Sequence, residues 1–108
     1  MEITQLKQLV QEIKQETIDS RRYLHMHPEL SFHEYETSSY IKDKLSYCGI
    51  SYEEVATTGV LAKVVGSLSP SDACVLLRAD IDALPIQECN GSAYDSMYPN
   101  VMHACGHD

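Results

Sequence analysis

The sequence predicts an α/β fold in which N-terminal helices pack on a mixed sheet. Apolar residues recur at helical spacing between residues 4 and 48, and strand-like runs follow after residue 49. With 108 residues the chain forms one domain at most. Hydrophobic residues make up 44% of it, which is ordinary for a globular protein and excludes a disordered tail.

Two helices are expected at the start of the chain. The first is amphipathic, covers residues 4–26 and ends near His27, because Pro28 disfavours helical geometry in the residue before it. The second begins at Ser31-Phe32-His33-Glu34, which fits a capping box with Ser31 as the N-cap. Gly49 is the expected residue just past its end.

Strand patterns follow the helices. Residues 50–55 alternate, residues 57–59 predict a turn, residues 60–65 form a β-rich run, and residues 67–72 predict a loop. Cys74-Val75-Leu76-Leu77 is apolar on both faces, which is typical of a strand buried in the middle of a sheet. Later turns are indicated at Asn90-Gly91 and Pro99-Asn100.

Two aspartates follow the run 74–77 directly. In open α/β sheets ligands bind beyond the carboxyl ends of the strands, and Asp80 and Asp82 share a face if the strand continues that far. The alternative is a solvated loop whose aspartates pair with Arg78. Carboxylates also serve as ligands or as orienting partners of metal-bound histidine, which favours the functional interpretation.

The segment His103-Ala104-Cys105-Gly106-His107-Asp108 carries the most chemistry. Thiolate and imidazole are ligands that Zn²⁺ and similar divalent ions favour. Side chains two residues apart point the same way in an extended segment, and Gly106 allows a sharp bend between Cys105 and His107. A metal centre needs three or four protein ligands, of which this segment supplies two or three.

The remaining cysteines and histidines have simpler interpretations. Cysteines 48, 74 and 89 are expected to be buried or incidental. Histidines 25, 27 and 33 lie near predicted helix ends, where a histidine is more often a capping or surface residue than a ligand.

Charge and hydropathy exclude several classes of partner. The formal charge of −8, from 16 acidic and 8 basic residues, argues against nucleic acid, which requires a basic surface. No apolar run approaches the roughly 20 residues of a membrane span, and residues 1–5 lack the features of a signal peptide. We therefore expect a cytoplasmic protein whose cysteines stay reduced.

Three motifs together resemble a known family. They are His27-Pro28-Glu29-Leu30-Ser31-Phe32 with Glu34 and Thr37, then Arg78 to Pro85, then His103 to Asp108. In this order they resemble the N-terminal part of the metal-dependent amidohydrolases. These include N-acyl-amino-acid amidohydrolases, hippurate hydrolases and auxin-conjugate hydrolases, which are related to aminoacylase and zinc carboxypeptidases. The resemblance covers residues 20–108.

The resemblance implies a zinc-peptidase-like catalytic domain, of which residues 1–108 are an incomplete N-terminal portion without the lid domain. It implies that Cys105 and His107 are metal ligands, with Cys105 shared between two ions, and that Asp82 supports the catalytic site from the strand end. Asp80 stands where related peptidases carry a ligand histidine. His103 and Asp108 are candidate supporting residues.

The implied reaction is amide hydrolysis of an N-acyl amino acid or small peptide at two divalent ions (Zn, Mn, Co or Ni). The family's general-base glutamate and remaining ligands lie further along its sequence than residue 108, so the truncated chain is expected to be inactive alone. One alternative is a non-catalytic module that binds a partner or self-associates through an exposed sheet edge. Another is a plain metal-binding protein that uses Cys105, His107 and His103.

Overall fold

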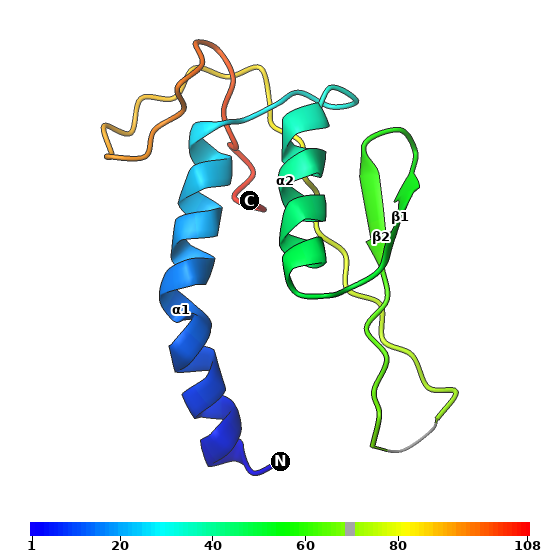
Figure 1. Cartoon of the computed structure of the whole chain (residues 1–108). Helices are drawn as coiled ribbons and strands as arrows, with labels where there is room; N and C mark the ends of the chain where they lie inside the picture. The colour runs from blue at the N-terminus through cyan, green and yellow to red at the C-terminus, as the bar shows by residue number, and fades with distance from the viewer. Residues whose placement is uncertain (69–70) are drawn as a thin grey trace.

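The computed structural model describes residues 1–68 and 71–108. It contains helices α1 (Ile3–Met26) and α2 (Tyr35–Tyr47), followed by strands β1 (Tyr52–Val55) and β2 (Gly59–Ala62). Figure 1 shows the two helices side by side, with the strand pair on the other side of α2 from α1. The predicted α/β class is confirmed. The sheet that the described residues form is two-stranded and antiparallel.

Helix α1 ends where the sequence predicts. Its last residue is Met26, and the backbone N–H of His27 donates to the carbonyls of Tyr23 and Leu24. Pro28 follows, so the helix stops within one residue of the expected position. The N-terminal half of α1 projects away from the rest of the molecule (Figure 1). No helix among the described residues is long and apolar enough to cross a membrane.

Helix α2 begins at Tyr35, so the prediction of Ser31 as its N-cap is wrong. Leu30 to His33 form a tight turn instead, in which the His33 N–H donates to the Leu30 carbonyl and Phe32 has a φ of 62°. This turn moves Ser31 away from the first helical N–H groups.

The carboxylate of Glu29 caps α2 in place of Ser31. Its Oε1 accepts from the Thr37 N–H and the Thr37 hydroxyl, each at 2.6 Å, and its Oε2 accepts from the Glu36 N–H at 3.2 Å. A negative charge there is also favoured by the helix macrodipole. Gly49 follows the helix with a φ of 68°, as its expected place after the C-cap requires.

The two strands form a hairpin whose register runs from Tyr52 opposite Ala62 to Val55 opposite Gly59. The turn occupies residues 56–58, one residue earlier than predicted, and β2 ends at Ala62 rather than continuing to residue 65. The Thr58 hydroxyl donates to the buried carboxylate of Glu34 at 2.8 Å, which attaches the hairpin turn to the start of α2. The predicted loop 67–72 includes residues 69 and 70, which lie outside the described residues.

The prediction of a buried strand at 74–77 is wrong in this structure. Val75, Leu76 and Leu77 are 85%, 81% and 89% exposed, and the segment belongs to neither strand. A central strand requires hydrogen-bonded neighbours on both sides. Within the described part of the chain the only strands are β1 and β2, which pair with each other.

Few apolar side chains are buried among the described residues. Ala83 is the one buried hydrophobic residue, and the apolar stripe of α1 is about half exposed, at Leu6, Leu9, Val10 and Ile13. The buried side chains are otherwise polar: His25, Glu34, Thr37, Ser38, Thr58, Glu88 and His103. Polar contacts therefore fix the positions of the segments that carry the candidate site.

Replacement of Glu29 by alanine is expected to lower the free energy of unfolding by about 1–3 kcal/mol, because three donors at the start of α2 lose their acceptor. Ser31→Ala is the matched control and should change it by less than about 0.5 kcal/mol. Urea unfolding followed by circular dichroism measures both. Equal losses, or a larger loss for Ser31→Ala, would show that Glu29 is not the cap.

Candidate functional site

Short backbone pairings bring the second and third sequence motifs together. Leu84 and Met102 exchange backbone hydrogen bonds of 2.9 and 3.1 Å, and the Ala83 N–H donates to the Glu29 carbonyl at 2.7 Å. These contacts place the turn after α1, residues 80–84 and residues 102–108 next to one another. Figure 1 shows the C-terminal end of the chain folded back beside the helices.

Asp80 and His107 meet at this junction. The Oδ2 atom of Asp80 lies 3.6 Å from Nδ1 of His107, and both side chains are exposed. Asp80 also accepts two hydrogen bonds from Arg78, at 2.8 and 3.1 Å. Asp80 therefore pairs with Arg78, as in the solvated-loop alternative, and also approaches the third motif at His107. The three residues and Ala79 line an open hollow of about 480 Å³.

Cys105 lies on the same exposed turn as His107. Its thiol is free, and Gly106 between them has a φ of 74°, so the bend predicted at this glycine is present. The donor types fit a divalent ion that prefers sulfur and nitrogen. Among the described residues, however, no three His, Cys, Asp or Glu side chains gather closely enough to hold a metal ion.

His103 is buried beside the half-buried Asp82, and its Nε2 atom has no hydrogen-bond partner. Burial lowers the pKa of His103, while Asp108 and the backbone of Asp82 act in the opposite direction. The lowered pKa keeps this imidazole neutral at neutral pH. A neutral ring with a free nitrogen is the form in which histidine binds metals.

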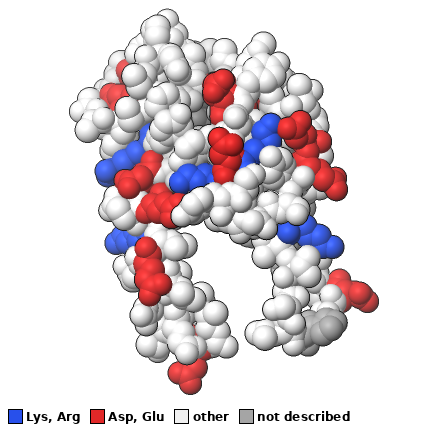
Figure 2. All heavy atoms as spheres, in the orientation of Figure 1, with Lys and Arg blue, Asp and Glu red and all other residues white. Residues whose placement is uncertain are grey.

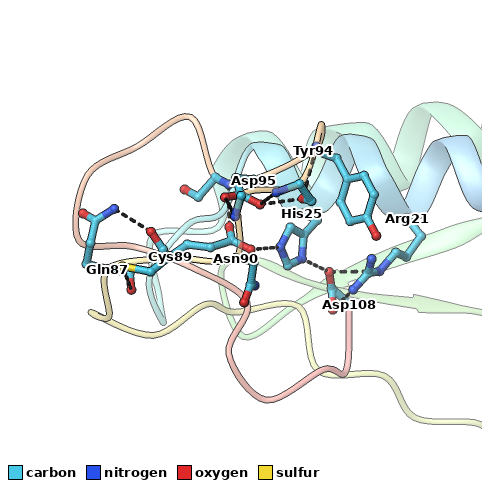
Figure 3. A network of polar contacts seen from close by, with 12 residues as sticks. Arg21, His25, Gln87, Cys89, Asn90, Tyr94, Asp95 and Asp108 are labelled. Atoms are coloured by element: carbon cyan, nitrogen blue, oxygen red, sulfur yellow. Dashed lines mark hydrogen bonds and ion pairs between the residues drawn. The ribbon is translucent and has the colours of Figure 1, made fainter.

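His25 is the functional candidate that the sequence analysis missed. The expectation of a surface or capping histidine is wrong, because its ring is buried between two carboxylates (Figure 3). Nδ1 lies 2.5 Å from Oδ2 of Asp108, and Nε2 lies 2.8 Å from Oε1 of Glu88. Arg21, one helical turn earlier, approaches Asp108 at 3.3 Å. The sequence does show that Arg21 and His25 are four residues apart, a spacing that places both side chains on one face of a helix.

The other histidines and cysteines lie nearer the surface. His27 is the C-cap residue of α1 and His33 is exposed, as expected for capping and surface residues. Cysteines 48, 74 and 89 were expected to be buried or incidental, and the structure excludes burial, because all three are exposed and free. Acidic and basic side chains are interspersed on the face shown in Figure 2.

The contacts of His25 with Glu88 and Asp108 shift the pKa of each of these three groups. Burial alone would lower the pKa of His25, but its hydrogen bonds to Glu88 and Asp108 raise it. Burial would raise the pKa of Glu88, but the bonds from His25, the Ser96 N–H and Asn90 lower it. The pKa of Asp108 is likewise lowered against the effect of burial, by His25 and Arg21. The three groups therefore stabilise one another in their charged forms.

Comparison with known proteins identifies relatives across most of the chain. A protein of Staphylococcus haemolyticus, named as an uncharacterised hydrolase, is 54% identical over 88 residues, which are 82% of this chain and 22% of that protein. The crystal structure of Bacillus subtilis YxeP, described as a dinuclear metal binding peptidase of the M20 family, matches with 43% identity and a TM-score of 0.79. The match covers 90% of this chain and 27% of that one.

A second solved structure, a Staphylococcus aureus protein described provisionally as an aminohydrolase, has 41% identity and a TM-score of 0.85. This match covers 96% of the present chain and 28% of the Staphylococcus aureus protein. No family model matches the sequence. The fold and motifs match those of part of these proteins, which are named as hydrolases and, for YxeP, as a dinuclear metal binding peptidase. The chain belongs to the peptidase family that contains YxeP, and it spans about a quarter of the length of the relatives it matches.

The paired charges predict a pH optimum of stability. The lowered pKa of Glu88 contributes stability above its ordinary value of 4.5, which is lost as the pH falls through the folded pKa. The raised pKa of His25 contributes stability below 6.5, which is lost as the pH rises through the folded pKa. The contribution of the pair is therefore greatest between these two values.

Glu88→Gln should reduce this optimum but not abolish it, because His25 still contacts Asp108. At about pH 6 we expect it to lower the free energy of unfolding by about 1–3 kcal/mol, because a buried charged hydrogen bond is lost. Urea unfolding of both proteins from about pH 3 to pH 9 measures the effect. Glu16→Gln, which alters an exposed pair with Lys44, is the control. Parallel pH profiles for wild type and Glu88→Gln would contradict the pairing.

Proposed function

We propose that this chain supplies the N-terminal metal-binding part of a hydrolase that cleaves the amide bond of N-acyl amino acids or small peptides. The observation that carries the proposal is the contact of His107 with Asp80. It brings together two sequence motifs that the family resemblance assigns to one catalytic site. The description of YxeP as a dinuclear metal binding peptidase supports the same chemistry.

In this proposal Cys105 and His107 hold the metal, which is Zn, Mn, Co or Ni, and Asp82 supports the site from the end of its segment. When two such ions are bound, they polarise a substrate carbonyl and lower the pKa of a water molecule. The carboxylate of Asp80, 3.6 Å from Nδ1 of His107, orients that ring in this proposal. His103 and Asp108 support the turn.

The residues of this chain provide only part of such a centre. Cys105 and His107 supply two donors, and the described residues contain no group of three. Because the relatives are about four times longer, we propose that the rest of the family fold supplies the other ligands and the general base. The free, exposed cysteines suit a reducing compartment, so we also propose a cytoplasmic location.

A chimera tests this proposal. Residues 1–108 replace the matching N-terminal part of YxeP, and hydrolysis of N-acetyl and N-benzoyl amino acids and of dipeptides is measured with added Zn²⁺, Mn²⁺, Co²⁺ or Ni²⁺. We expect metal-dependent hydrolysis by the chimera and none by the isolated chain. Cys105→Ala and Asp82→Ala should reduce kcat/KM at least about 100-fold, because the metal loses a ligand or its support.

Ser31→Ala serves as the matched control in the chimera and should retain activity. Turnover by the isolated 108-residue chain would show that the site is complete without further residues. Full activity of Cys105→Ala in the chimera would show that the thiolate holds no catalytic metal. Activity on dipeptides but not on N-acyl amino acids would contradict the proposed substrate while leaving the metal site intact.

A second candidate function is self-association, which the exposed segment Val75–Leu77 favours. Three neighbouring apolar side chains on an extended, unpaired segment are a surface that a second copy of the chain can cover. Sedimentation velocity should show a dimer or larger species, and Leu76→Asp should shift it to the monomer. Tyr47→Ser removes a similarly exposed side chain on α2 and is the control. A wild-type monomer would contradict this function.

A further inference from the structure

The segment that carries Cys105 and His107 is fixed at both of its ends. At one end, Met102 exchanges two backbone hydrogen bonds with Leu84. At the other, the side chain of Asp108 is only 1% exposed and contacts helix α1. His107, one residue earlier, is 64% exposed. The exposed turn between these two attachments is therefore limited in the positions it can reach.

The attachment at Asp108 depends on two residues of α1. Oδ2 of Asp108 lies 2.5 Å from Nδ1 of His25 and 3.3 Å from Nε of Arg21, and Oδ1 accepts a longer bond of 3.4 Å from Nη2 of Arg21. Figure 3 shows the ring of His25 and the guanidinium of Arg21 directed at the same carboxylate. The side chains of His25 and Asp108 are almost fully buried, whereas that of Arg21 is 40% exposed, so His25 is the main partner.

The second ring nitrogen of His25 contacts a different segment of the chain. Nε2 contacts Glu88, whose carboxylate also accepts hydrogen bonds from the Ser96 N–H at 2.5 Å and from Asn90 at 2.8 Å. These contacts hold Glu88 in place, and Glu88 in turn fixes the orientation of the imidazole. The two ring nitrogens therefore serve two different segments, and their effects can be separated by substitution.

We propose that His25, assisted by Arg21, is a positioning residue for the metal-binding turn and acts through Asp108. This inference rests on the proposed function, because it assumes that Cys105 and His107 hold a metal ion. His25 itself contacts no metal in this assignment. The contact of Nδ1 with Asp108 sets where Asp108 lies, and the neighbouring His107 and the bend at Gly106 follow from that position. Of the two ring nitrogens, only Nδ1 contacts the segment that carries the metal-binding turn.

Two substitutions of His25 separate these possibilities. The amide nitrogen of asparagine can take the place of Nδ1, and that of glutamine the place of Nε2. His25→Asn therefore retains a donor toward Asp108 and loses Glu88, whereas His25→Gln retains a donor toward Glu88 and loses Asp108. The readout is Co²⁺ binding to the chimera with YxeP, because the proposed function assigns the other metal ligands to the rest of the family fold; the chimera without a further substitution serves as the wild type. Binding is followed by the absorption band of a cobalt–thiolate bond, with helix content measured by circular dichroism.

We expect the wild type to give the cobalt–thiolate band and Cys105→Ser to lose it, while Cys89→Ser, which removes an exposed thiol outside the turn, retains it. His25→Gln should weaken Co²⁺ binding about tenfold or more, as removal of an outer partner of a metal site does, and His25→Asn should change it less than about threefold. Absence of the band in the wild type would contradict the proposed function, and this inference with it.

Other outcomes overturn the inference alone. If the wild type binds Co²⁺ and neither His25 variant alters the affinity, or both weaken it equally, His25 does not position the turn. If His25→Gln loses helix content, Arg21→Gln decides, because Arg21 reaches Asp108 from a partly exposed position. Weaker Co²⁺ binding by Arg21→Gln with unchanged helix content supports the inference, and unchanged binding overturns it.

Discussion

The buried imidazole of His25 between two carboxylates is the interaction on which the arrangement of this chain depends. Helix α1, the loop that begins at Glu88 and the segment that ends at Asp108 are distant in sequence, and this ring contacts all three. Apolar packing does not hold these segments together in the described part of the chain, where Ala83 is the one buried hydrophobic residue. Charged, hydrogen-bonded contacts are directional, so they fix positions that loosely packed apolar groups leave free.

Local signals in the sequence predicted the helices well and the remaining elements in part. Pro28 and Gly49 act through backbone geometry that depends only on adjacent residues, so the ends of both helices followed from them. The N-cap of α2 did not, because Glu29 reaches Thr37 across a turn at Phe32 that no local pattern indicated. The left-handed backbone of Asn100 agrees with the turn predicted there.

The site was predicted as a set of residues, but not as an arrangement. Asp80, Cys105 and His107 were predicted from their chemistry and spacing, and the structure places His107 3.6 Å from Asp80. His25 was overlooked because its role depends on Glu88 and Asp108, which lie far away in sequence. The apolar run 74–77 has the composition of a central strand, but its pairing depends on neighbouring strands that the described residues do not contain.

The unpaired segment Val75–Leu77 has a consequence for how the chain resists proteolysis. Proteolytic enzymes grip their substrates as extended backbone with free N–H and C=O groups, and they favour accessible, weakly held stretches. This stretch is solvent-accessible and joined to neither strand. Proteases are therefore expected to cut this stretch early, and a cut there would separate the two helices and the hairpin from the turn that bears Cys105.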